Sequence, residues 1–282
     1  MDQRVRVNTP SAKSPLGALK DALKCLYEQR WLAVYFVQRQ LTSSYKSSFL
    51  GLSWLFFSPL LLIVLYTLVF SQFLGLRFRE VDSVTNFGLY LYCGLIPYMA
   101  FGDTLNQGVA SIRSNANLVG KVVFPVEILP LSTAATAFTS QFFGLAGLLV
   151  LTGILERELQ VTTLLLPLFM ISQLFFLLGL GYLAAVAGTF LPDIKETLRA
   201  FVRAMFFITP IIFPVDRVPD DFQFLVTYNP LAYVVESWRN LVLDGTIPPL
   251  NETFWFSLFS VGLLAVSFAL FVRVRPRFGD MI

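Results

Sequence analysis

The sequence contains no histidine, the side chain that most often serves as a general base and as a metal ligand. It contains only two cysteines, Cys25 and Cys93, and the topology derived below puts them in different compartments. We therefore expect no disulfide and no metal site. Without histidine a Ser-His-Asp set is impossible, so we also expect no catalytic residues in this chain.

A phosphate-binding loop is missing as well. Such a loop needs an earlier glycine, a Gly-Lys pair and a following Ser or Thr, so that backbone N–H groups surround the phosphates. The only Gly-Lys pair is Gly120-Lys121, but Val122 follows it and Asn115 occupies the earlier glycine position. The chain itself therefore does not bind nucleotide in this way.

Charged residues are scarce in the apolar segments. The chain is 56% hydrophobic with 29 Phe and a net charge of +3, whereas soluble domains are about 45–50% apolar. Asp103 is the one acid within a span, roughly 24 Å from Phe87 along a helix and near its cytoplasmic end. We interpret it as a capping or headgroup-level residue, with a proton or ion site as the alternative. The lack of other buried acids argues against ion-coupled transport.

Six apolar blocks follow one another, and their lengths are typical of membrane spans. They cover about 52–74, 87–108, 128–153, 161–190, 198–213 and 253–272. The fifth block is short, and Pro210 and Pro214 predict a break near its end. With the N-terminus inside, the outside segments hold few of the 21 Lys and Arg, namely Arg77, Arg79, Arg157, Arg217 and Arg239. This bias predicts six transmembrane helices in one domain, 1–282, with both termini cytoplasmic.

The N-terminal region precedes the first span. Residues 1–25 are polar and basic, lack the apolar core of a signal peptide, and are interpreted as a cytoplasmic tail. In residues 26–50, aromatic and apolar residues such as Tyr27, Trp31 and Tyr35 recur every fourth position between polar ones. This spacing predicts an amphipathic helix in the membrane interface. An amphipathic helix packed on its own protein is the alternative.

The longest polar interruption between two apolar blocks runs from Arg113 to Pro130 and carries Lys121 and a single acid, Glu127. It lies between the second and third blocks, on the cytoplasmic side in this topology. We predict a short cytoplasmic helix here, on which another protein acts. Glu127 stands at the start of the third block, where the helix dipole favours an acid.

The last outside segment, from Pro214 to Glu252, is long but rich in apolar residues. Asn229-Pro230 divides it. We predict two short re-entrant helices at the outer face, because irregular backbone at membrane depth survives only when protein buries it or when it lines a water-filled cavity. A small extracellular cap without a gating role is the alternative.

Aromatic residues are concentrated in the first and fifth blocks, including Trp54, Phe57, Tyr66, Phe206 and Phe207. Each ring taken alone is explained by lipid contact or packing. Taken together, they suggest a pathway lined with rings, since aromatic faces stack on the apolar faces of sugars.

Six short motifs occur in an order that points to a known family. They comprise Tyr45, Lys46, Ser48, Leu50, Gly51, Trp54 and Pro59; Gly94, Leu95, Ile96, Pro97, Tyr98 and Phe101; Asn117, Leu118, Lys121, Phe124, Pro125, Glu127 and Pro130; Asp193, Ile194 and Lys195; Thr209, Pro210, Ile211 and Phe213; and Asn229-Pro230. From about residue 35 onward, the chain resembles the membrane subunits of ABC-type polysaccharide exporters, the O-antigen, capsule and teichoic-acid permeases. It departs from their pattern at Gln40, Ser44 and Leu191-Pro192.

The resemblance implies a homodimer that works with two copies of a separate ABC ATPase in the bacterial inner membrane. ATP and Mg would bind to that partner, so this chain would be a permease without a cofactor and not an enzyme. The substrate would be a lipid-linked glycan, and membrane lipids but no nucleic acid would be further partners.

The resemblance also implies roles for single residues. The ATPase-coupling residues would be Ser114, Asn115, Asn117, Leu118, Val119 and Lys121. The conduit would be lined by Trp54, Phe57, Tyr66, Phe206, Phe207 and Phe213. The outer gate would include Pro214, Phe222, Asn229 and Pro230. Arg39 and Lys46 are candidates for a contact with the substrate headgroup, with bulk lipid as the alternative.

O-antigen is the expected cargo. Capsule, teichoic acid, or a smaller lipid or drug are alternatives within the same class of permease. A membrane enzyme of glycan synthesis is the alternative from another class, and it would use the outside acids Asp216, Asp220, Asp221, Glu236 and Asp244.

Overall fold

The computed structural model describes residues 15–43, 51–54, 57, 61, 64–65, 68–69, 84–121, 124–155, 159–191 and 193–281. All regular structure within these ranges is helical, which confirms the all-α prediction. Most of the first predicted span, including Tyr66, lies outside the described residues, and so does Lys46. The count of six spans therefore stays a prediction.

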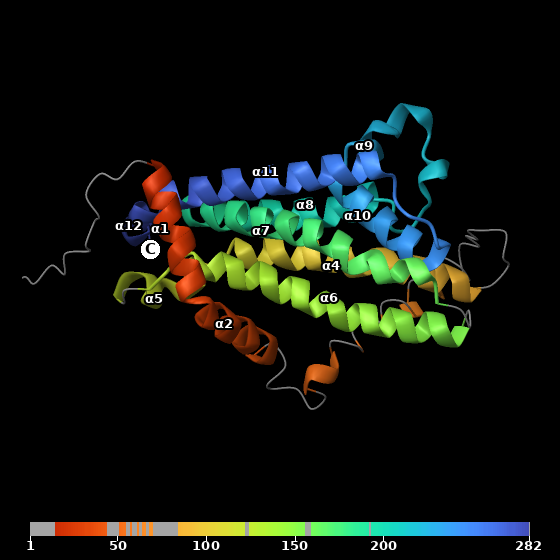
Figure 1. Ribbon diagram of the computed structural model, residues 1–282, viewed down its shortest axis with the longest axis horizontal. Coiled ribbons are helices and arrows are strands. Elements are labelled where there is room, and N and C mark those ends of the chain that lie inside the picture. Colours follow the sequence, from red (N-terminus) through yellow and green to blue (C-terminus); the bar gives the residue numbers. More distant parts are fainter. Residues whose placement is uncertain are drawn as a thin grey trace, which may run out of the picture.

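Four long helices lie side by side and form the body of the molecule (Figure 1). They are α4 (Val84–Gly108), α6 (Ile128–Leu155), α7 (Leu166–Phe190), which follows the 3-10 turn η4 (Val161–Leu165), and α11 (Leu250–Val274). Three segments, Ile128–Leu155, Val161–Phe190 and Leu250–Arg277, could cross a membrane by length and composition. They overlap the third, fourth and sixth predicted blocks.

Small residues bring α4 and α7 into close contact. A Cβ atom added at Gly188 of α7 would lie 1.9 Å from the carbonyl oxygen of Val109, which directly follows α4. One added at Gly108 would lie 3.2 Å from Cβ of Ala184. In a membrane, helices associate chiefly through such close packing, because lipid tails are as apolar as the side chains. These glycines therefore set the distance between the two helices.

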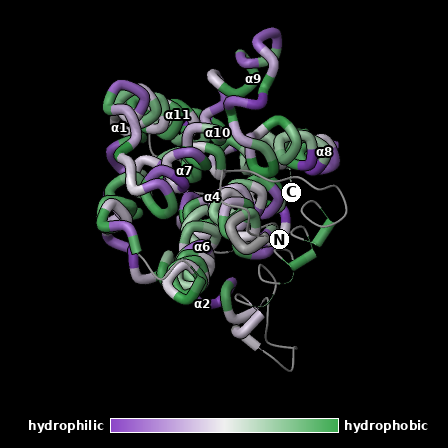
Figure 2. Tube along the Cα trace, turned by 90° about the vertical axis from the view of Figure 1, so that its right-hand side faces the viewer, coloured by the Kyte–Doolittle hydropathy of each residue, from purple (hydrophilic) through white to green (hydrophobic). Residues whose placement is uncertain are grey.

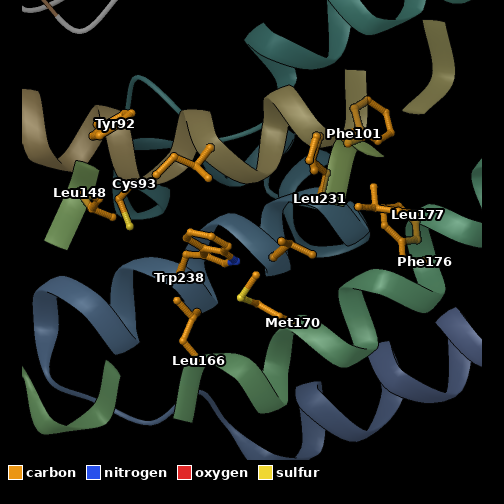
Figure 3. Packing of buried hydrophobic residues seen from close by; sticks show 14 of the residues in the cluster. Tyr92, Cys93, Phe101, Leu148, Leu166, Met170, Phe176, Leu177, Leu231 and Trp238 are labelled. Atoms are coloured by element: carbon orange, nitrogen blue, oxygen red, sulfur yellow. The ribbon is translucent and has the colours of Figure 1, made fainter. Parts of the chain in front are cut away.

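Helix α10 (Pro230–Arg239) inserts Trp238 into the centre of the bundle. Figure 3 shows the indole beside Cys93, Leu166 and Met170, and all four residues belong to the main buried cluster. Trp238 Nε1 donates to Gln173 Oε1 at 3.2 Å, and Gln173 Nε2 donates to Gln141 Oε1 at 3.0 Å. A buried tryptophan needs such an acceptor for its N–H group, and this chain of polar groups links α10, α7 and α6.

The N-terminal region contains two helices, whereas the sequence predicted a tail over 1–25 and one interface helix over 26–50. Helix α1 (Pro15–Glu28) begins inside the predicted tail, and α2 (Arg30–Ser43) starts only after Gln29. The first residue of α1 is Pro15, and proline suits this position because its fixed φ angle is helical and its missing N–H would be unpaired there anyway. Helix α2 packs along α6, where Thr136 Oγ1 donates to Gln40 Oε1 at 2.9 Å. The 3-10 turn η1 (Gly51–Ser53) follows.

The fifth block is shorter as a helix than as an apolar run. Helix α8 (Ile194–Ile208) ends at Thr209, which is extended because Pro210 follows, so the predicted break is confirmed. The 3-10 turns η5 (Val215–Arg217) and η6 (Asp220–Phe222) and the single-turn helix α9 (Phe224–Thr227) come next, and α10 continues into a π-helical turn, η7 (Asn240–Asp244). Figure 2 shows α9 and its flanking turns projecting beyond the long helices.

The opposite end of the molecule holds the 3-10 turn η3 (Arg113–Asn115), α5 (Ala116–Lys121), the 3-10 turn η8 (Arg275–Arg277) and α12 (Phe278–Met281). Helix α1 and the C-terminus lie at this end as well (Figure 1). We call it the α5 end of the bundle, and we call the opposite end, where α9 lies, the α10 end.

Candidate functional site

The predicted coupling residues form η3 and α5. Hydrogen bonds hold their backbone: Ser114 Oγ donates to the carbonyl of Ala110 at 2.8 Å, and Asn115 Nδ2 donates to that of Ser111 at 2.8 Å. Arg113 Nη2 donates to the carbonyl of Thr189 at 3.0 Å, which fastens the segment to the last turn of α7. The segment is therefore attached to the bundle independently of any partner.

The side chains of this segment divide into two groups. Ser114 and Asn117 are exposed, whereas Leu118 and Val119 are half-buried against a cluster of apolar residues. Lys121 ends α5, and its side chain is not among those described. The segment thus offers a polar surface outward while its apolar side chains anchor it.

The apolar cluster beneath α5 is named here the α5-end cluster. It joins residues that are far apart in the sequence, from α1, α2, the turn before η3, the α5–α6 connection, α6, α7, α11 and α12. Its buried members are Ala22, Phe36, Ile112, Val126, Ile128, Leu129, Tyr182, Ala185, Phe268, Phe271, Val272 and Phe278. The half-buried Leu118 and Val119 of α5 therefore pack against side chains from several helices.

Glu127 is a fully buried carboxylate beside this cluster. Its Oε1 forms an ion pair with Nη1 of Arg275, and its backbone carbonyl accepts a hydrogen bond from Tyr182 Oη at 3.1 Å. Among the described residues, Oε2 of Glu127 has no hydrogen-bond donor. Burial raises the pKa of the nearby Cys25 thiol; the charge of Glu127 raises it further, and that of Arg275 lowers it.

At the α10 end, Asn229 joins two elements. Its Oδ1 accepts from the N–H of Leu231 at 3.0 Å and so caps α10, while its Nδ2 donates to Thr209 Oγ1 at 3.1 Å. Asparagine is among the preferred N-cap residues, and Pro230 suits the first helical position that follows it. The Asn229-Pro230 pair thus starts α10 and ties it to the end of α8.

Arg239, the last residue of α10, is buried with 1% of its surface exposed. Its Nη2 donates to the carbonyl of Ile211 at 2.7 Å, and Nη1 donates to the carbonyl of Pro210 and to Glu236 Oε1, the latter at 2.7 Å. Its Cζ lies 3.5 Å from the ring centroid of Tyr90. One guanidinium therefore connects α10, α4 and the turn after α8.

Aromatic rings follow the contact between α4 and α8. The ring centroid of Tyr98 lies 5.3 Å from that of Phe206, which lies 5.3 Å from that of Phe207. Phe101 continues the row at 6.4 Å from both Tyr98 and Phe201. Tyr98 also donates from Oη to the carbonyl of Val202 at 2.8 Å, which fixes α8 to α4.

Among the predicted conduit residues that the structure describes, the rings of Phe206 and Phe207 have centroids 5.3 Å apart. Phe206 and Phe213 both pack against a third buried cluster. Trp54 is half-buried and Phe57 is exposed. In the predicted gate, Pro214 is half-buried and Phe222 is exposed, whereas Asn229 and Pro230 occupy the structured start of α10. Arg39 is exposed, and its Cζ lies 5.9 Å from the Phe36 ring centroid.

Sequence reasoning missed Arg239 and Arg275 as contact residues. It counted Arg239 among the outside charges, but the side chain is buried, because backbone carbonyls and Glu236 satisfy it. The separation of partners explains the omission: Arg239 lies 149 residues from Tyr90, and Arg275 lies 148 residues from Glu127. The one feature of the sequence that could have indicated the burial of Arg239 is its position directly after the apolar residues of α10.

Comparison with known proteins gives a family match. The family model for the ABC-2 type transporter matches residues 33–243. The O-antigen export system permease protein RfbA of Myxococcus xanthus is 27% identical over 259 residues, covering 91% of this chain and 97% of that protein. RfbA of Klebsiella pneumoniae is 27% identical over 254 residues, covering 89% and 95%, respectively. The polysialic acid transport protein KpsM of Escherichia coli is 24% identical over 236 residues, covering 83% and 89%.

Proposed function

The chain belongs to the ABC-2 type transporter family, and from this premise we propose that it is the membrane permease of an ATP-driven exporter that moves a lipid-linked polysaccharide across the bacterial inner membrane. The observation that carries the proposal is the near full-length similarity to permeases named for O-antigen export. O-antigen is therefore the proposed cargo, and transport runs from the cytoplasmic to the outer leaflet.

The proposed topology has six spans with both termini in the cytoplasm. It rests on the bias of Lys and Arg toward one set of loops, together with the three helices that suit a membrane by length and composition. In this topology the α5 end faces the cytoplasm and the α10 end faces outward. Two copies of the chain form the permease.

A separate ABC ATPase, also in two copies, supplies the energy and binds the ATP and Mg. Its contact is the segment η3–α5, where Ser114 and Asn117 are exposed. Leu118 and Val119, which pack on the α5-end cluster, connect that contact to the bundle. The polar surface and the apolar anchor of this short segment support such a coupling role.

The row of rings along α4 and α8 forms part of the wall that the glycan passes. Phe207 is 69% exposed in a single chain, which leaves its ring free to face the conduit or the second copy. The segment around α9 and α10 acts as the outer gate, in which the exposed Phe222 precedes α9 along the chain and the Asn229-Pro230 turn follows it. Arg39 is exposed on α2 and stays a candidate for the substrate headgroup.

The test is co-purification of this chain with the ATPase encoded beside it, with ATP hydrolysis and surface polysaccharide measured together. Asn117→Ala, alone and with Leu118→Ala, should reduce both activities by about fivefold or more, since coupling between sites commonly has this magnitude. Lys20→Ala, an exposed change on α1, is the control. If no ATPase binds and surface glycan survives deletion of the gene, the proposal is wrong.

A second cargo is favoured by specific relatives. KpsM is named for polysialic acid transport, and a 21% identical protein of Neisseria meningitidis is named for capsule polysaccharide export. Capsule is therefore the alternative cargo. Analysis of the polysaccharide lost from the cell surface after deletion of the gene distinguishes the two, because surface O-antigen is joined to lipid A core and capsule is not.

A further inference from the structure

The C-terminal residues Arg275–Met281 lie against the coupling segment and not apart from it. Helix α12 contacts both α5 and α7, and η8 joins it directly to α11. Phe278 is 1% exposed, and its ring centroid lies 5.1 Å from that of Phe271 and 6.0 Å from that of Phe190. The chain therefore turns back after α11 and inserts an aromatic anchor between α11 and α7.

Beside this anchor, the ion pair between Arg275 and Glu127 fastens the C-terminal residues to the start of α6. Glu127 is fully buried, while the Arg275 side chain is 39% exposed. A buried charge is costly unless it is paired, so Arg275 holds Glu127 in place and Glu127 holds η8 against the α5–α6 connection. Tyr182 adds a tie from α7 to the same residue.

We propose that residues 275–281 form a C-terminal clasp, in which Arg275 and Phe278 are positioning residues that fix the α5–α6 connection to α7 and α11. A displacement of α5 then moves α6, α7 and α11 together. Without the clasp, the Arg113–Thr189 hydrogen bond and the packing of Leu118 and Val119 remain, so a displacement of α5 is passed to α7 and α11 less completely. This inference rests on the proposed function, because it assigns the clasp to the coupling of ATP hydrolysis to export.

Substitutions at Arg275 and Glu127 disturb the ion pair to different degrees. Arg275→Ala removes the cation and leaves a buried carboxylate, so it disturbs the site most. Glu127→Gln removes the buried charge but keeps the shape, and the half-exposed Arg275 is then free to contact water, so this variant should stay folded. Arg275→Lys keeps a positive charge at the same position. Arg277→Ala is the matched control, because Arg277 lies in the same turn and is exposed.

The experiment uses the full permease with its ATPase, both expressed from the native operon. ATP hydrolysis is measured on the purified complex, and surface polysaccharide is measured on the cells. For Glu127→Gln and Arg275→Ala we expect the ATPase to remain bound and to hydrolyse ATP, while surface polysaccharide per ATP hydrolysed falls by about fivefold or more. Arg275→Lys should recover most of that ratio, and Arg277→Ala should leave it unchanged.

The outcomes separate this inference from the proposed function. If the wild-type pair exports glycan but Glu127→Gln and Arg275→Ala keep the wild-type ratio, the clasp has no coupling role and the exporter assignment stands. If Arg275→Ala fails to assemble, Glu127→Gln decides the matter, since it leaves no unpaired buried charge. If the wild-type chain binds no ATPase, the proposed function fails and the clasp fails with it.

Discussion

In the part of the chain that the structure describes, each end of the bundle contains one buried charge, and the two are satisfied in different ways. Arg239 at the α10 end donates to the backbone carbonyls of Pro210 and Ile211 and to Glu236. Glu127 at the α5 end relies on Arg275 for one carboxylate oxygen, and its other oxygen has no donor among the described residues. The first charge is held mainly by backbone, whereas the second is held by a single, partly exposed side chain.

This difference indicates where the molecule is fixed and where it is adjustable. Fully satisfied buried networks rigidify their surroundings, so α10, α4 and the turn after α8 should move as one body. Under the proposed function, opening of the outer gate would then require α8 to carry α10 with it, or would require α9, which lies outside this network, to move alone. At the α5 end, exchange of the single Arg275–Glu127 contact changes the link between η8 and the start of α6, while the packed side chains of the α5-end cluster remain.

The largest effect is expected when the Arg239 network is removed. Arg239→Ala leaves buried carbonyls without donors and should destabilise the protein by about 3–5 kcal/mol, the range found for broken buried pairs. The measurement is thermal unfolding of the purified permease in detergent, with yield recorded in parallel. Arg203→Ala, an exposed change in α8, is the control and should have little effect. A variant as stable as wild type would show that backbone carbonyls at this end do not need Arg239.

Arg239→Lys tests whether the arrangement of the donors of Arg239, and not only its charge, stabilises this end. A lysine ammonium has no planar fork and cannot reach the same set of acceptors, so the substitution should restore only part of the stability. Full recovery would mean that charge alone, and not the arrangement of the donors, holds the turn after α8.

A smaller effect is expected at the N-cap of α10. Asn229→Ala removes the acceptor for the N–H of Leu231 and should cost about 1 kcal/mol. Asn229→Asp keeps that acceptor but loses the donor to Thr209 Oγ1, so it should recover most of the loss. Unfolding of both variants with and without Thr209→Val measures the Asn229–Thr209 tie as a double-mutant cycle, and strictly additive effects would argue against the tie.

The sequence predicts the limits of the helices better than it predicts the buried charges at the two ends. The break after α8 could be predicted, because Pro210 forces Thr209 out of helical geometry. The limits of α6 and α11 followed from long apolar runs, and the predicted starts at 128 and 253 lie within a few residues of Ile128 and Leu250. Neither buried charge could be predicted, because burial depends on contacts between residues up to 149 positions apart. Counting charges in loops places Arg239 outside, because such a count does not show that the carbonyls of Pro210 and Ile211 accept hydrogen bonds from it.

The smallest effect, on the reactivity of Cys25, tests the α5 end with little disturbance of the fold. Burial raises the pKa of Cys25; Glu127 raises it further, Arg275 lowers it, and Glu28 makes the last contribution, which is again to raise it. The thiolate is the reactive form, so removing a cause that raises the pKa should increase the rate of alkylation at a fixed pH below the pKa. Cys93 is fully buried and should not contribute to the rate.

Three variants follow from this order of causes. Glu127→Gln should speed alkylation, Glu28→Gln should speed it less, and Arg275→Ala should slow it, while Arg277→Ala should leave it unchanged. The rate of maleimide labelling across a pH series gives the apparent pKa of Cys25 in each variant, with Cys93→Ser as background. An unchanged pKa in both Glu127→Gln and Arg275→Ala would mean that the ion pair does not lie beside α1. The opposite shifts expected for those two variants distinguish electrostatics from loosening of the α5 end, since loosening would expose Cys25 and accelerate labelling in both.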